Sequence, residues 1–183
     1  MKKFLLILGL VLVIILSALM YIRMVYTKKP SPVGITKFES GETRITVEYY
    51  RPYKKGRVIF GELVPFGKVW RTGANDATLF ETNKDLVFGN QTLKAGEYSI
   101  FTIPGEQVWS VIFNSETGQW GVGFNGEANR NPAKDKLSVE AIPSNLQDKV
   151  IEQFTIALEK SGEDMELIFM WDKTLVSVPF MIK

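Results

Sequence analysis

Short runs of alternating apolar and polar residues dominate this sequence from residue 33 to its end. The run from Arg44 to Tyr50 is the clearest, because Ile45, Val47 and Tyr49 fall on one side of an extended chain and the residues between them on the other. Glycine, proline, serine and asparagine separate successive runs, as they do in proteins built from antiparallel strands. The pattern predicts about ten to twelve short strands and an all-β fold, an antiparallel β-sandwich or jelly-roll.

The expected strands cover most of the chain after residue 33. In chain order they are 34–38, 44–50, 58–60, 68–71, 77–82, a hairpin over 86–93, 96–103, 108–114, 136–142, 154–159, 166–171 and 175–182. Two of them, 96–103 and 108–114, carry apolar residues on both faces, which favours central positions covered on two sides. Pro179 lacks the N–H group that a ladder needs, so we expect the last strand at a sheet edge. A single helical turn is expected within 144–151.

The first 29 residues have a different composition. Lys2 and Lys3 precede Phe4–Ile22, a run of nineteen residues without a charge. At about 1.5 Å per residue, a helix of that length reaches roughly across the ~30 Å hydrocarbon core of a bilayer. A cleaved signal peptide is the alternative, but its apolar region is typically about 7–15 residues long and ends at small residues. The sequence therefore favours an uncleaved anchor that crosses the membrane with residues 4–22.

This anchor sets the expected domain organisation and location. Residues 1–29 form the signal anchor, and residues 30–183 form the β-sandwich domain. Because only a short tail precedes the apolar run, we expect that tail to stay inside and the domain to lie outside the cytoplasm, in a bacterial periplasm or cell envelope. No cysteine is present, so such a domain is held by its core and not by disulfides.

The charge of the chain is unevenly distributed. Five of the 22 basic residues and none of the 20 acidic residues precede Pro30, which leaves the domain with 17 basic and 20 acidic residues and a net charge of −3. An acidic domain argues against nucleic acid as a partner. Within residues 51–71, however, the balance reverses. Six basic residues meet one acid there, Glu62: Arg51, Lys54, Lys55, Arg57, Lys68 and Arg71.

The absence of histidine and cysteine restricts the chemistry. Without them the chain lacks the usual zinc ligands and cannot carry a serine–histidine or cysteine–histidine nucleophile. No phosphate-cradling glycine motif and no calcium-loop pattern occurs. We therefore expect no metal, no cofactor and no catalytic residue that the sequence can identify.

A polar run after an expected strand is the candidate binding site. It reads Trp70, Arg71, Thr72, Gly73, Ala74 and Asn75. A guanidinium, a hydroxyl and an amide at a strand end could bind a carboxylate, a phosphate or sugar hydroxyls, and we expect these groups to face solvent. Arg51 and Arg57 are the candidates that would join Trp70, Arg71, Thr72 and Asn75 in lining the site. In the structural alternative, Arg71 pairs with a buried acid and Asn75 closes a turn.

Two other functions stay open from the residues alone. A carboxylate-based hydrolase would use Glu62 or Asp76, although the sequence gives no reason to pair any two acids. An envelope assembly partner would dock another protein on an edge strand or on the acidic face. The glycine- and asparagine-rich stretch from Asn114 to Asp135 is a long loop of the kind that is often functional, and Trp120 within it is the tryptophan expected to be exposed.

Several motifs resemble those of the DUF2911 family, a domain of unknown function common in Bacteroidetes. The matching stretches are 50–52, 55–57, 59–61, 64–75, 77–78, 95–105 and 120–121, and the run Trp70 to Asn75 is the most specific of them. The resemblance extends from about Ser31 to the carboxyl end. It implies an all-β domain exported to the cell envelope, and it implies no activity.

Overall fold

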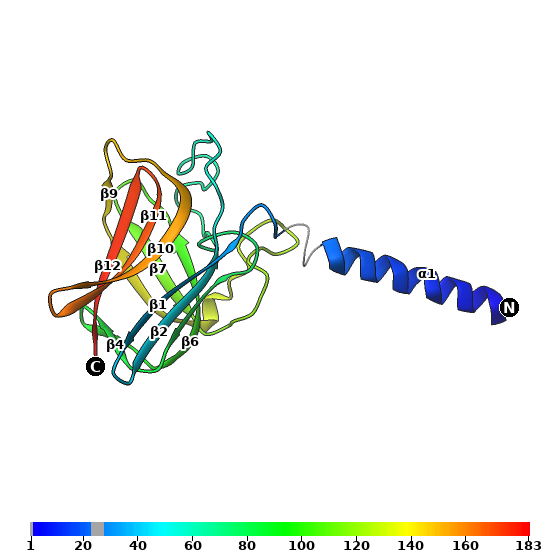
Figure 1. The fold of residues 1–183 in the computed structure, drawn as a ribbon, viewed down its shortest axis with the longest axis horizontal. Coiled ribbons are helices and arrows are strands. Elements are labelled where there is room, and N and C mark those ends of the chain that lie inside the picture. Colours follow the sequence, from blue (N-terminus) through cyan, green and yellow to red (C-terminus); the bar gives the residue numbers. More distant parts are fainter. Residues whose placement is uncertain (1, 23–27) are drawn as a thin grey trace.

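The computed structural model describes residues 2–22 and 28–183. One helix, α1 (Lys2–Tyr21), precedes a domain made of strands (Figure 1). The described strands are β1 (Val33–Ser40), β2 (Thr43–Tyr50), β3 (Thr78–Thr82), β4 (Leu86–Phe88), β5 (Gln91–Leu93), β6 (Gly96–Ile103), β7 (Trp109–Asn114), β8 (Asp135–Ala141), β9 (Pro143–Asn145), β10 (Ile151–Ser161), β11 (Asp164–Asp172) and β12 (Thr174–Ile182). A short 3-10 helix, Pro132–Lys134, precedes β8.

The strands form two antiparallel sheets that face each other as a sandwich, which confirms the predicted fold class. The first sheet has the order β1-β2-β3-β6-β7-β8, and the second has the order β10-β11-β12-β4-β5 with β9 paired to β12. Strands distant in sequence therefore become neighbours, as where β12 at the carboxyl end pairs with β4. At one side of the sandwich β1 also approaches β10 of the opposite sheet.

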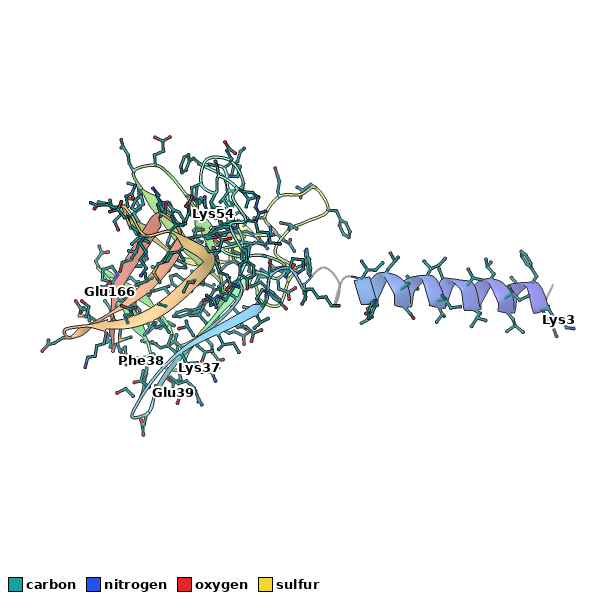
Figure 2. All side chains as sticks on the ribbon, turned by 45° about the horizontal axis from the view of Figure 1, so that its top comes forward. Lys3, Lys37, Phe38, Glu39, Lys54 and Glu166 are labelled. Atoms are coloured by element: carbon teal, nitrogen blue, oxygen red, sulfur yellow. The ribbon has the colours of Figure 1, made fainter. Side chains whose placement is uncertain are left out.

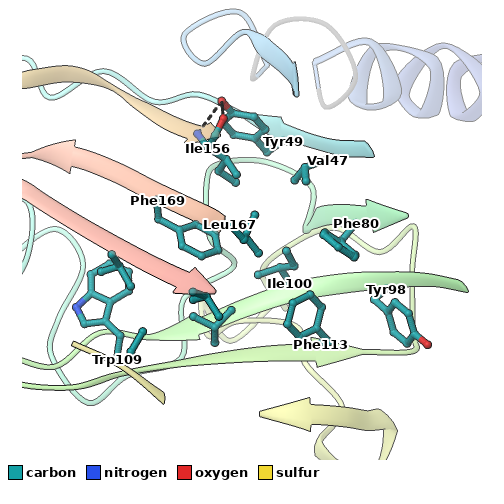
Figure 3. Close-up of a cluster of buried hydrophobic side chains, with 14 of the residues drawn as sticks. Val47, Tyr49, Phe80, Tyr98, Ile100, Trp109, Phe113, Ile156, Leu167 and Phe169 are labelled. Carbon is teal, nitrogen blue, oxygen red and sulfur yellow. Dashed lines mark hydrogen bonds between the residues drawn. The ribbon is translucent and has the colours of Figure 1, made fainter. Parts of the chain in front are cut away.

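The core lies between the sheets and follows the alternation in the sequence. Ile45, Val47 and Tyr49 of β2 are buried, and the intervening side chains are not. They meet residues of the second sheet such as Leu167 and Phe169 in one contiguous apolar cluster (Figure 3). Strands β6 and β7 are buried on both faces and lie inside the first sheet, as their sequences predict.

Tyr49 joins the sheets by hydrogen bonds as well as by packing. Its hydroxyl donates to the carbonyl of Ile156 in β10 at 3.2 Å and accepts from the N–H of the same residue at 2.8 Å (Figure 3). Burial raises the pKa of Tyr49, and the hydrogen bond to Ile156 opposes that rise. One phenol thus bonds both backbone groups of a residue in the opposite sheet.

Three expectations about individual segments were wrong. Residues 58–60 and 68–71 form turns, with one isolated bridge each, at Phe60 and Trp70. Neither bridge continues into a ladder, so neither segment becomes a strand. Residues 144–151 hold β9 and a turn and contain no helical turn. β12 is an interior strand and not the expected edge strand. On one side of β12, β9 pairs only with residues 174–176 and β4 only with residues 181–182. Pro179 is tolerated because it has no strand partner on that side.

Helix α1 is exposed along its whole length. It is long and apolar enough to cross a membrane, and by length and position it fits either an anchor or a signal peptide. The structure thus supports the coarser prediction of an amino-terminal membrane or export helix.

Candidate functional site

Residues 51–77, which connect β2 to β3, form an irregular segment that closes one end of the sandwich. Trp70 anchors it to β6 by a reciprocal pair of backbone hydrogen bonds with Thr102, at 2.7 and 2.9 Å. The backbone of Pro52 accepts from Phe154 of β10, which ties the same segment to the second sheet. Lys54 of this segment and Glu39 at the end of β1 lie at opposite ends of the domain (Figure 2). The segment that the sequence marks as most basic therefore covers one end of both layers.

Within it, residues Trp70 to Asn75 make a tight, strained turn. Thr72 has a φ of 57° and Asn75 a φ of 56°, values that a β-branched residue such as threonine rarely adopts. Gly73 has a φ of 146°, and a Cβ there would lie 2.8 Å from the carbonyl oxygen of Tyr50. The indole N–H of Trp70 donates to the carbonyl of Gly73 at 3.1 Å and closes the turn. Such strain persists only where surrounding contacts enforce it, and it is concentrated at functional sites.

Arg71 and Asn75 each carry a buried hydrogen-bond donor that has no acceptor among the described residues. Nε of Arg71 and Nδ2 of Asn75 are both buried and have no hydrogen-bond partner among the described residues. None of the ion pairs between described residues involves Arg71. Burial lowers the pKa of Arg71, yet an arginine side chain stays protonated in proteins. The turn therefore holds a cation that forms no ion pair with any carboxylate of residues 2–22 and 28–183.

Both residues line one cavity of about 350 Å³. Its walls include the rings of Trp70 and Trp171, which stack at 5.9 Å between centroids with an interplanar angle of 15°. No acidic residue lines it. The lining residues are Pro30, Ser31, Pro52, Tyr53, Lys55, Arg57, Leu63, Val64, Trp70, Arg71, Gly73, Ala74, Asn75 and Trp171. The arrangement is a cationic, donor-rich pocket with an aromatic wall.

The structure brings four of the six predicted site residues to this cavity: Arg57, Trp70, Arg71 and Asn75. Arg57 is exposed and donates to the carbonyls of Tyr53 and Lys54 in its own turn. Contrary to the expectation of a solvent-facing run, Trp70 and Asn75 are buried and Arg71 is partly so.

Arg51 and Thr72 have other contacts. The guanidinium of Arg51 donates to the carbonyl of Phe154 at 3.1 Å and to the hydroxyl of Thr155 at 2.9 Å, and it does not line the cavity. Thr72 is completely buried, and its hydroxyl bonds to that of Thr102 at 3.1 Å. Arg51 therefore ties the segment to β10, and Thr72 ties it to β6.

Sequence reasoning missed two contributors to the pocket. Trp171 in β11 is a core residue, as its sequence pattern predicts, but it also lines the cavity, a hundred residues from Arg71 in the sequence. Lys55 lies in the basic run and adds a second cation at the mouth. The basic residues clustered within 51–71 could have indicated Lys55 as a site residue, whereas no feature of the sequence around Trp171 indicates that it lines a pocket.

The carboxylates proposed for a hydrolase lie elsewhere. Glu62 is exposed in a turn, whereas Asp76 forms an ion pair with Lys28 at 2.5 Å. Asp76 lines a different cavity, together with a second acid, Glu48. Glu48 was not among the acids proposed from the sequence. In residues 2–22 and 28–183 no group of three or more histidine, cysteine, aspartate or glutamate side chains could hold a metal ion.

Comparison with known proteins gives one match. A family model described as "Protein of unknown function (DUF2911)" matches residues 31–180. No curated protein and no solved structure matches the chain.

Proposed function

The chain belongs to the DUF2911 family, and from that premise we propose that it is a membrane-tethered module whose β-sandwich lies outside the cytoplasm and binds a small anionic ligand. The ligand carries a carboxylate or phosphate group, acidic sugars included, and this group sits between Arg71 and Asn75.

The observation that carries the proposal is the pair of buried, unpartnered donors. Leaving one buried donor without an acceptor costs about 1–3 kcal/mol, and more when the group is charged. Arg71 and Asn75 incur that cost in the same strained turn, four residues apart in the sequence, and both line the same cavity. An oxyanion supplies several acceptor lone pairs to both donors at once and compensates the charge of Arg71.

The rest of the cavity fits the same ligand class. With about 350 Å³ of volume it is at the lower end of the range for small-molecule pockets, roughly 300–1,000 Å³. Lys55 and Arg57 at its mouth add positive charge that attracts anions, and no carboxylate on the lining repels them. The rings of Trp70 and Trp171 offer an apolar wall for the body of the ligand.

Less supports the two alternatives. For a carboxylate-based hydrolase, Asp76 would have to act while paired with Lys28, and Glu62 does not share its cavity. An envelope assembly partner could dock on the edge strand β1, where the apolar side chains of Val33 and Ile35 are exposed. The same face of β1 continues with the charged residues Lys37 and Glu39, so it is not a continuous apolar surface.

The test uses the full-length protein in detergent micelles. Its thermal unfolding and tryptophan fluorescence are measured with benzoate, glucuronate, inorganic phosphate and, as the neutral comparison, glucose. A ligand at a hundred times its Kd raises the unfolding temperature of a protein of this size by roughly 5–10 °C. We expect at least one anion to do so and glucose to have no effect. Trp70 and Trp171 report binding directly because both line the cavity.

Arg71→Ala is expected to abolish the response, and Arg44→Ala serves as the matched control because Arg44 is exposed on β2, outside the cavity. An anion response that survives Arg71→Ala unchanged, or no response to any anion of the panel, contradicts the proposal.

A further inference from the structure

The loop of residues 119–129 holds one apolar side chain entirely in solvent. Phe124 has a relative exposure of 113%, the highest of any large apolar side chain in the described chain. It lies at the tip of the loop, between Gly123 and Asn125. Exposing a phenylalanine side chain to water costs free energy, and burying it in an apolar environment would recover that free energy.

The tip is a small, hydrogen-bonded hairpin. Val122 bridges Ala128, and the N–H of Gly123 donates to the carbonyl of Glu127 at 2.8 Å. The side chain of Asn125 accepts from the N–H of Glu127 and holds the turn. Phe124 is thus presented outward by ordered backbone.

The base of the loop is fixed beside the point where the chain enters the domain. Asp76 bridges Trp120, and the same Asp76 pairs with Lys28. The ammonium of Lys28 lies 5.7 Å from the centre of the Trp120 ring, within cation–π range. Lys28, Asp76 and Trp120 therefore form one cluster that joins the amino-terminal tether to the loop.

Chain length keeps this cluster near the end of α1. Six peptide steps separate Ile22 from Lys28, and an extended chain covers at most about 3.6 Å per step, or about 22 Å in all. If α1 spans a bilayer, the base of the loop can stand no farther than that from the end of the span. Phe124 is four residues beyond Trp120, on a hairpin that extends the reach of the domain.

We propose that the tip of the 119–129 loop inserts Phe124 into the membrane interface beside α1, so that the domain has a second, reversible contact with the bilayer. This inference rests on the membrane tether of the proposed function and is independent of the anion pocket. Aromatic rings prefer the interfacial zone of a bilayer, and the exposed Lys29 next to the tether favours anionic lipid headgroups. The contact would fix which face of the sandwich points at the membrane.

The experiment measures depth by spin labelling in nanodiscs of mixed phosphatidylcholine and phosphatidylglycerol. The chain has no cysteine, so a single introduced cysteine is labelled uniquely in the full-length protein. Asn125→Cys places the label next to the native Phe124, and Ile14→Cys places it in the middle of the helix. Ile142→Cys places it on an exposed site that directly precedes β9, a strand that lies away from α1 in Figure 1. Accessibility to oxygen, which concentrates in lipid, is compared with accessibility to a water-soluble nickel chelate.

We expect the label at 125 to favour oxygen over the chelate, as the label at 14 does, and the label at 142 to favour the chelate. Adding Phe124→Ser to Asn125→Cys should reduce the ratio at 125 to that at 142. A ratio at 125 that equals the ratio at 142 while position 14 reports lipid overturns the loop contact and leaves the tether intact. A water-exposed label at 14 overturns both. If Phe124 instead contacts a partner protein, the ratio of oxygen to chelate accessibility at position 125 in nanodiscs alone is that of a water-exposed site. That result also overturns the proposal.

Discussion

The side chain of Arg71 lies directly on the backbone of Gly121. A Cβ built at Gly121 would be 2.2 Å from Cδ of Arg71 and 2.9 Å from its Cβ, closer than real atoms approach. The N–H of Gly121 also donates to the carbonyl of Asn75 at 2.9 Å. The loop that carries Phe124 thus holds the guanidinium of the candidate pocket in place.

Gly121→Ala tests this contact. The added methyl must displace Arg71, and overpacking of this kind typically costs about 1–3 kcal/mol. We expect that loss in chemical denaturation together with a loss of the anion response. Gly118→Ala, just before the same loop, is the matched control: its φ of 78° strains an alanine, but no atom of the described residues lies within 4 Å of the new Cβ. That variant should lose about 1 kcal/mol and keep the anion response. Equal anion binding by both variants would contradict the positioning of Arg71 by Gly121.

Arg71→Met separates binding from stability. Methionine keeps most of the unbranched stem and removes a buried, unpaired charge, so the unliganded protein should be as stable as the wild type or more stable by about 1 kcal/mol. The anion response should disappear. Urea denaturation with and without the anion measures both effects. A loss of several kcal/mol would show that Arg71 holds the fold and would count against a binding role.

Asn75→Asp places a carboxylate where the unpartnered amide lies. Aspartate tolerates the left-handed backbone of this position, and its charge would compensate the buried Arg71. We expect a more stable unliganded protein that no longer binds anions, since the internal carboxylate competes with the ligand. Calorimetric titration with the best anion of the panel checks the second point. Unchanged affinity would place the ligand away from Asn75.

Tyr49→Phe removes the hydroxyl that joins the sheets. The N–H and the carbonyl of Ile156 would both be left buried without a partner, at about 1–3 kcal/mol each. We expect a total loss of about 2–6 kcal/mol in the free energy of unfolding. Tyr98→Phe is the comparison, because that hydroxyl makes one hydrogen bond, to the carbonyl of Lys94, and its loss should cost about 1 kcal/mol. Similar losses for the two variants would contradict the bridging role of Tyr49.

Asp85 gives a prediction about pH. The ammonium of Lys94, together with the backbone N–H of Ala95, lowers the pKa of its carboxyl below the ordinary value. A group whose pKa is lower in the folded state stabilises the protein above its unfolded pKa of about 3.9, and that contribution is lost as the pH falls through the folded pKa. The stability difference between wild type and Asp85→Asn should therefore be constant near neutral pH and shrink in acid. Denaturation curves across that range test it, and a difference independent of pH would refute it.

The sequence could predict the elements whose information is local. Ile45, Val47 and Tyr49 alternate with polar residues, and that period alone defines which face of β2 is buried. The hairpin around residues 104–107 likewise follows from turn residues between two apolar runs. The strands expected at 58–60 and 68–71 did not form, because a ladder needs a partner strand that continues alongside, and each segment makes only one bridge. The sequence of the segment itself does not contain that information.

The amino-acid order by itself determined the all-β class and the apolar helix, and it made the run from Trp70 to Asn75 a candidate site. Periodicity, length and residue type are properties of neighbouring residues. Only the tertiary structure decided that Arg71 is a partly buried cation without a carboxylate partner among the described residues, and that Trp171 joins its pocket. The burial and pairing of a charge depend on atoms that folding brings from distant strands, and no local pattern records them.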